Sequence, residues 1–254
     1  MGALEHWRRV RALTGELEAL PEAGALSLEA HVETVRLGTY TGLEEGEVAE
    51  LVGDVDRALI RSQRAIEHAE RADSPLLKIL VYGEYGSALT ESGRAEAAVQ
   101  SLEEAVEIAR VSGVAHNILG LQLARLAEAY ASLHRFKPAL DCAEQAIQVA
   151  RRSGHRLVEA QAQLTLARVL LLTDEASAAA SVAAALQECD RLIEETGARV
   201  LEPPLHEVRA HLAALRRDHA TSARELRTAH ALFTEIGATG HAARLSALGR
   251  DHSA

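Results

Sequence analysis

The stretch 82-YGEYGSALTESGRAEAAVQSLEEA-105 decides the fold of this chain. It predicts two helices joined at Gly93, because small and apolar residues recur at helical spacing on both sides of that glycine. A small residue at Gly86 lets the second helix approach the first, and Ala98 and Ala105 are the small faces that it meets. The stretch therefore predicts two antiparallel helices that bury one face against each other.

The same pattern recurs further along the chain, which indicates a repeat rather than a single hairpin. The second copy has His134 where the first has its turn glycine, and the third has a longer, alanine-rich turn. The fourth copy is the weakest. The matching residues are Leu123, Leu126, Ala127, Tyr130, Ala139, Ala143 and Ala146, then Leu166, Ala167, Leu170, Val182, Leu186 and Cys189, and finally Arg209, Ala210, Ala213, Ser222, Leu226 and Ala229.

Glycines follow the helical patterns at regular intervals, where a left-handed C-cap is expected. Gly113, Gly154, Gly197 and Gly237 are separated by 41, 43 and 40 residues. The sequence also marks where a helix begins, since Ser74-Pro75 is typical of an N-cap followed by proline at the first helical position. Starts and ends together predict a repeat period of 40 to 43 residues.

From residue 82 to residue 237 the chain resembles the tetratricopeptide superfamily, on the residues just quoted. Tyr82, Tyr85, Gly86 and Leu89 follow the W-x2-L-G-x2-Y spacing of its first helix, although the period exceeds the usual length of about 34 residues. The long period and the ending Ala-Arg-x-Ser-Gly at 109–113 and 150–154 are similar to the C-terminal sensor arrays of bacterial adenylate-cyclase-linked signal-transduction ATPases and maltose-regulon-type activators. The resemblance implies an all-α, right-handed superhelical solenoid of antiparallel helix pairs.

In such proteins the array follows a nucleotide-binding switch domain and binds inducers or partner proteins. This sequence has no Gly-Lys pair and therefore no P-loop, and it shows no helix-turn-helix motif with a basic recognition helix. The resemblance thus implies an excised sensor domain or a stand-alone relative. The leading function that the resemblance implies is protein-protein interaction in bacterial signalling or transcription regulation, with a partner segment bound in the concave groove. The alternative is a receptor for a small-molecule or short-peptide inducer.

The expected organisation has three parts: an N-terminal helix with a degenerate first pair, four repeat pairs, and a terminal helix whose polar outer face caps the solenoid. The boundaries are 1–23 for the N-terminal helix, 24–73 for the degenerate pair, 75–113, 114–154, 155–197 and 198–237 for the four pairs, and 238–254 for the capping helix and tail.

Polar residues of the first helices that avoid the packing positions are candidate contacts for the partner, because solenoids bind on their concave surface. Among them Arg125 and Arg168 are suited to hold carboxylates. The competing interpretation is a solvated helix face with incidental pairs such as Arg125 with Glu128. The full candidate set is Arg36, Glu84, Ser87, Arg125, Glu128, Arg168, Glu207 and His211.

Composition limits the classes of partner. The net charge of −10 argues against direct binding of nucleic acid, which needs basic clusters. No stretch approaches the roughly 20 apolar residues of a membrane span, and the charged N-terminus is unlike a signal peptide, so a cytoplasmic location is expected. Cys142 and Cys189 lack metal or redox spacing and are expected to be reduced core residues. Pairing of uncapped solenoid ends into a homo-oligomer is left open.

No motif supports catalysis, a cofactor or a metal. Ser87 lacks the G-x-S-x-G elbow of a serine nucleophile. His206 and His211 are five residues apart, whereas helical metal ligands need three or four, and His219 and His230 are interpreted as surface or half-buried residues. Tyr82, Tyr85, Tyr130 and Phe233 occupy or adjoin packing positions and are interpreted as core rather than as a ligand pocket. The sequence therefore predicts a protein that is not an enzyme.

Overall fold

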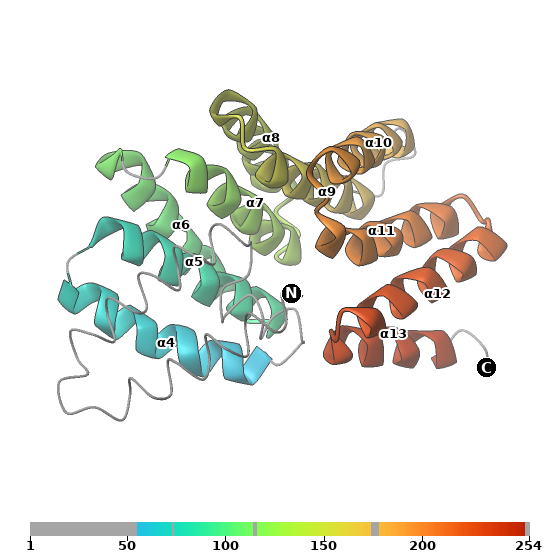
Figure 1. The fold of residues 1–254 in the computed structure, drawn as a ribbon, viewed down its shortest axis with the longest axis horizontal. Coiled ribbons are helices and arrows are strands. Elements are labelled where there is room, and N and C mark those ends of the chain that lie inside the picture. The colour runs from blue at the N-terminus through green and yellow to red at the C-terminus, as the bar shows by residue number, and fades with distance from the viewer. Residues whose placement is uncertain (1–54, 73, 114–115, 174–177, 252–254) are drawn as a thin grey trace. The chain divides into compact units, whose positions relative to one another are not determined.

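A computed structural model describes residues 55–72, 74–113, 116–173 and 178–251, all within one compact unit (Figure 1). These residues form helices and short turns, with no strand among them, so the predicted all-α solenoid is confirmed. The predicted helix 1–23, the residues of the degenerate pair before 55 and Arg36 lie outside the described residues. The helices are α4 (Val55–Ala72), α5 (Pro75–Glu91), α6 (Ala95–Ser112), α7 (His116–Ser132), α8 (Phe136–Ser153), α9 (Arg156–Leu172), α10 (Ala178–Thr196), α11 (Glu202–Leu215), α12 (His219–Glu235) and α13 (Thr239–Asp251), with a 3-10 turn at Arg199–Leu201 before α11.

Consecutive helices lie against each other along the chain, as Figure 1 shows from α4 to α13. A second set of contacts joins α5 to α7, α7 to α9 and α9 to α11, whereas α6, α8 and α10 make no comparable contacts with one another. Helices that also touch across the repeat lie on the inside of a curved stack. We call α5, α7, α9, α11 and α13 the inner helices, and α13 is included because an ion pair joins it to α11.

Small residues at the crossing of each helix pair fix the packing register. A Cβ on Gly86 would lie 3.0 and 3.1 Å from the two δ-carbons of Leu102 and closer still to its Cγ. Leu102 and Ala98 are fully buried in the same core. The alanines predicted to pack in the next pairs are buried too, namely Ala127, Ala139, Ala143, Ala146, Ala167 and Ala210. The register predicted around Gly86 is therefore confirmed.

Long helices account for the long period. The helices from α5 to α10 each have 17 to 19 residues, so two of them already equal or exceed the length of a standard repeat of about 34 residues. The extra residues therefore belong to both helices of a pair and not to a long loop between them.

The helix ends follow the predicted signals. Ser74 caps α5, and its side-chain oxygen accepts from the backbone N–H of Leu77 at 3.5 Å. Gly113, Gly154, Gly197 and Gly237 have φ values from 62 to 80°. His134 adopts φ 56° in the turn where the first copy has Gly93, and Arg217 adopts φ 60° in the corresponding turn after α11. Left-handed turns therefore persist where the glycine does not.

The side-chain amide of Gln122 is buried between α7 and α5. The residue is 0% exposed, and neither its oxygen nor its nitrogen has a hydrogen-bond partner among the described residues. Gly83 makes room for it, because a Cβ there would lie 2.6 Å from the Gln122 Cδ. A buried amide without partners costs free energy that an apolar side chain of similar size avoids.

Replacing Gln122 by methionine is therefore expected to raise the free energy of unfolding by about 1 kcal/mol. The measurement is urea unfolding followed by circular dichroism, with Gln100→Met on the exposed face of α6 as the matched control. A loss of stability in Gln122→Met alone would mean that the amide has partners in solution.

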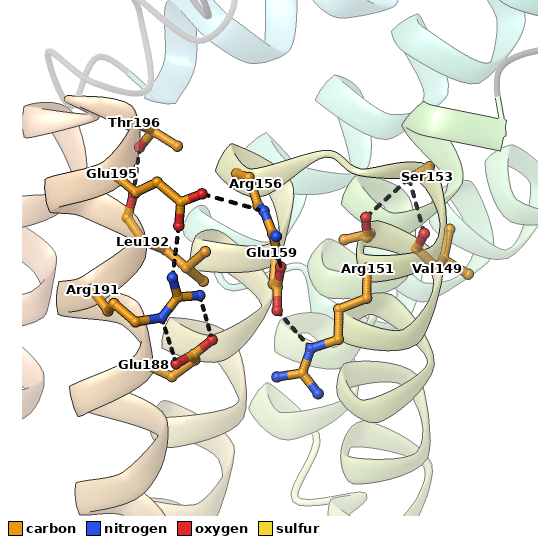
Figure 2. Close-up of polar contacts among 11 residues, drawn as sticks. Val149, Arg151, Ser153, Arg156, Glu159, Glu188, Arg191, Leu192, Glu195 and Thr196 are labelled. Carbon is orange, nitrogen blue, oxygen red and sulfur yellow. Dashed lines mark hydrogen bonds and ion pairs between the residues drawn. The ribbon is translucent and has the colours of Figure 1, made fainter.

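A chain of ion pairs joins α8, α9 and α10 (Figure 2). Its centre is Glu159 of α9, 1% exposed, whose oxygens accept from Arg151 of α8 at 2.6 Å and from Arg156 at 2.9 Å. Arg156 also lies 3.6 Å from Glu195 of α10, which pairs with Arg191 at 2.6 Å. The three helices are thus connected by charge as well as by their apolar faces.

Candidate functional site

Four of the predicted contact residues occupy one equivalent position of the repeat. Each directly follows the small residue at which a helix pair packs, and one further residue turns the helix by about 100° away from the packing contact. The side chain there lies outside the packing contact of its own helix pair. These residues are Ser87 after Gly86, Glu128 after Ala127, Arg168 after Ala167, and His211 after Ala210.

Glu128 connects two inner helices. Its Oε1 accepts from the Arg168 guanidinium at 2.8 Å and from the Thr165 hydroxyl at 3.0 Å, both on α9. Both charged side chains keep about a third or more of their surface open to solvent. The pair therefore stabilises the α7–α9 contact and still faces the solvent on the inner side.

Glu207 makes the equivalent connection at the end of the solenoid. Its two oxygens accept from one guanidinium nitrogen of Arg244 at 2.8 and 2.9 Å, which joins α11 to α13. The Glu207 side chain is only 11% exposed, whereas that of Arg244 is half exposed.

The two pairs belong to one electrostatic environment. Desolvation by neighbouring protein atoms lowers the pKa of Arg168, but the charge and hydrogen bond of Glu128 and the charges of Glu207 and Glu91 outweigh that effect, so the pKa lies above its ordinary value. Desolvation by neighbouring protein atoms lowers the pKa of His211, although the residue keeps exposed surface and the charge of Glu207 partly opposes this shift. His211 is therefore neutral at neutral pH.

Charges of the same side chains also act on Glu91, the last residue of α5. Desolvation by surrounding protein atoms and the nearby charge of Glu128 raise its pKa to about 7, against the partial opposition of Arg244 and Arg168. Its side chain nevertheless keeps exposed surface. Polar groups from five successive inner helices thus act on one another. We call this set the inner cluster: Glu91, Glu128, Thr165, Arg168, Glu207, His211 and Arg244.

The predicted contact residues differ in how much of each side chain a partner could reach. Glu84 and Ser87 lie half-buried on α5, about two turns and one turn before Glu91. Arg125 is 8% exposed, so little of it could touch a partner, and Glu128 pairs with Arg168 of the next inner helix. Their role as partner contacts stays a prediction.

Three members of the inner cluster were missed from the sequence. Glu91 lies one helical turn beyond Ser87, and this spacing could have identified it. Arg244 lies on α13, which was predicted only as a cap and not as a further inner helix. Thr165 carries no charge, and only its bond to Glu128 identifies it.

The cysteines and His206, which elsewhere can act as nucleophiles or metal ligands, lie in structural surroundings here. Burial raises the pKa of Cys142 to about 11 and that of Cys189 to about 12, and both are free thiols. His206 pairs with Glu225 at 2.6 Å. In the described ranges no group of three or more histidine, cysteine, aspartate or glutamate residues could hold a metal ion. None of the described helices is long and apolar enough to cross a membrane.

Comparison with known proteins identifies the repeat in one segment of the chain. Residues 80–111 match the model of the tetratricopeptide repeat family. Two crystal structures of nearly identical TPR-like repeats, from a Podosopora anserina protein described as a kinesin light chain, each cover 75% of this chain and 92% of their own at 16% identity. Their TM-scores are 0.49 and 0.48. No curated protein matches the chain. Over residues 80–111 the chain is therefore similar to the tetratricopeptide repeat, within an all-α solenoid of helix pairs.

Proposed function

We propose that this chain is an interaction module that receives a segment of another protein on its inner face, as part of a bacterial signalling or transcription-regulatory protein. The observation that carries the proposal is the inner cluster, in which polar groups from α5, α7, α9, α11 and α13 act on one another. Helix packing alone does not need such groups, since the cores lie between the helices. A charged surface built from successive repeats suits an extended ligand that touches several repeats.

The test adds a bulky side chain to the inner face, by which we mean the side of the inner helices that carries the inner cluster. His211→Trp adds a large side chain at an exposed member of the inner cluster, and His219→Trp adds the same side chain at an exposed position of α12 as a matched control. Fluorescence anisotropy with short, degenerate, fluorescein-labelled peptides is expected to show binding to the unmodified protein. His211→Trp should weaken that binding at least about tenfold, as expected when an interface position is obstructed.

Both variants should keep their unfolding free energies within about 0.5 kcal/mol, because the substituted side chains are at the surface. Equal binding by His211→Trp and by the control would contradict the inner face as the binding surface.

One observation favours a second candidate, a receptor for a small polar inducer. The charge of Arg244 on α13 acts on Glu91 of α5, so the first and last described inner helices both contribute to one electrostatic site. In that case a single metabolite should raise the melting temperature in proportion to the logarithm of its concentration, whereas peptides should not.

A further inference from the structure

Not every charged side chain of the inner cluster has an oppositely charged partner. Arg168 is held by Glu128, and Arg244 is held by Glu207. Glu91 has neither a hydrogen bond nor an ion pair within the part of the chain that the structure describes. Each arginine of the cluster is thus occupied by a carboxylate, and one carboxylate is left over.

The position of Glu91 makes this excess negative charge available to a ligand. The residue ends α5 on the inner side, and its side chain keeps exposed surface. The charge of Glu128 acts on it unfavourably, while Arg168 and Arg244 are near enough to act on it without bonding to it. A cation that arrived at Glu91 would relieve this repulsion, whereas an anion would add to the negative charge of a cluster that holds three carboxylates against two guanidinium groups.

We propose that the segment bound on the inner face carries an arginine or lysine side chain that pairs with Glu91. This inference rests on the proposed function and specifies the chemistry of its partner. A metal ion does not suit the position, because no group of three ligating side chains occurs within the described ranges. An organic cation needs only one carboxylate, and the net charge of −10 of the chain favours the approach of a basic segment.

The proposal is tested with sets of degenerate peptides that share one fixed central residue, which is arginine, lysine, alanine, aspartate or glutamate. The arginine and lysine sets are expected to bind the unmodified protein at least about tenfold more tightly than the acidic sets. Glu91→Gln should remove most of that preference. Glu144→Gln, on the exposed face of α8, should keep it and serves as the matched control.

Proton release gives a second measurement with a definite sign. The pKa of Glu91 is raised to about 7, so about half of the free protein carries a proton there at pH 7, and pairing with a cation expels it. Calorimetry of the tightest basic peptide in buffers of different ionisation enthalpy should show release of about half a proton at pH 7 and almost none at pH 9. The affinity should fall as the pH falls below 7. Glu128, Arg168, Glu207, His211 and Arg244 face the same site, so the same titration with Glu91→Gln separates the contribution of Glu91 from theirs.

The outcomes separate this inference from the proposed function. Tighter binding of the acidic sets, or equal loss of basic preference in Glu91→Gln and Glu144→Gln, would overturn the cationic partner and leave the interaction module standing. Proton release that persists unchanged in Glu91→Gln would also overturn the pairing with Glu91. If none of the sets binds, both the proposed function and this inference fail.

Discussion

Replacing Gly86 by leucine is expected to lower the free energy of unfolding by about 2 kcal/mol or more. Overpacking of a closed core costs about 1–3 kcal/mol, and the new Cβ alone would lie 3.0 Å from a δ-carbon of Leu102. Leu102 is fully buried among neighbouring side chains and has little room to move. The higher helix propensity of leucine returns only about 0.8 kcal/mol.

Urea unfolding followed by circular dichroism at a helical wavelength measures this loss. Ser87→Leu, one residue further along α5, is the matched control, since it introduces the same side chain outside the packing position. An unchanged midpoint for Gly86→Leu would contradict the crossing of α5 and α6 described above.

Removing both arginines that hold Glu159 should have an effect of similar size. The double variant Arg151→Met, Arg156→Met keeps most of the apolar stems but leaves a carboxylate of 1% exposure without a counter-charge. Breaking a buried ion pair costs about 3–5 kcal/mol. Because both arginine side chains are about half exposed, we expect a smaller loss of about 2–3 kcal/mol.

Adding Glu159→Gln to that double variant provides the decisive comparison. A neutral amide costs less to bury than an unpaired carboxylate, so the triple variant should recover much of the lost stability. If the triple variant is as unstable as the double variant, the contribution of the arginines lies in packing and not in charge.

The packing of the solenoid could be predicted because it depends on short-range spacing. Gly86, Ala98 and Ala105 lie within one helix pair, and helical periodicity alone decides which faces meet. The ends of the helices could be predicted for the same reason, since a left-handed C-cap favours glycine at that one position whatever the rest of the fold. Even His134 was identified as a turn residue, by its place in the repeat.

The inner cluster was predictable only in part, because its pairs join residues far apart in sequence. Glu128 reaches Arg168 on the next inner helix, 40 residues further along the chain. Such a choice depends on the distance between helices and on the reach of two long side chains, and neither has a sequence signal. The same reason hides the ion pairs from Arg151 through Glu159 to Arg156, although each residue belongs to a recognisable helix end.

Each small packing residue and the residue that follows it meet different structural demands. Gly86, Ala127, Ala167 and Ala210 are constrained by the neighbouring helix, while the next residue in each repeat is serine, glutamate, arginine or histidine. Where such residues pair across repeats, as Glu128 does with Arg168, a change in one repeat calls for a matching change in the next, whereas Ser87 has no such pair in the described residues. A duplicated or exchanged repeat would bring its own residue to this position, so that the charge pattern of the inner helices could change by recombination of whole units.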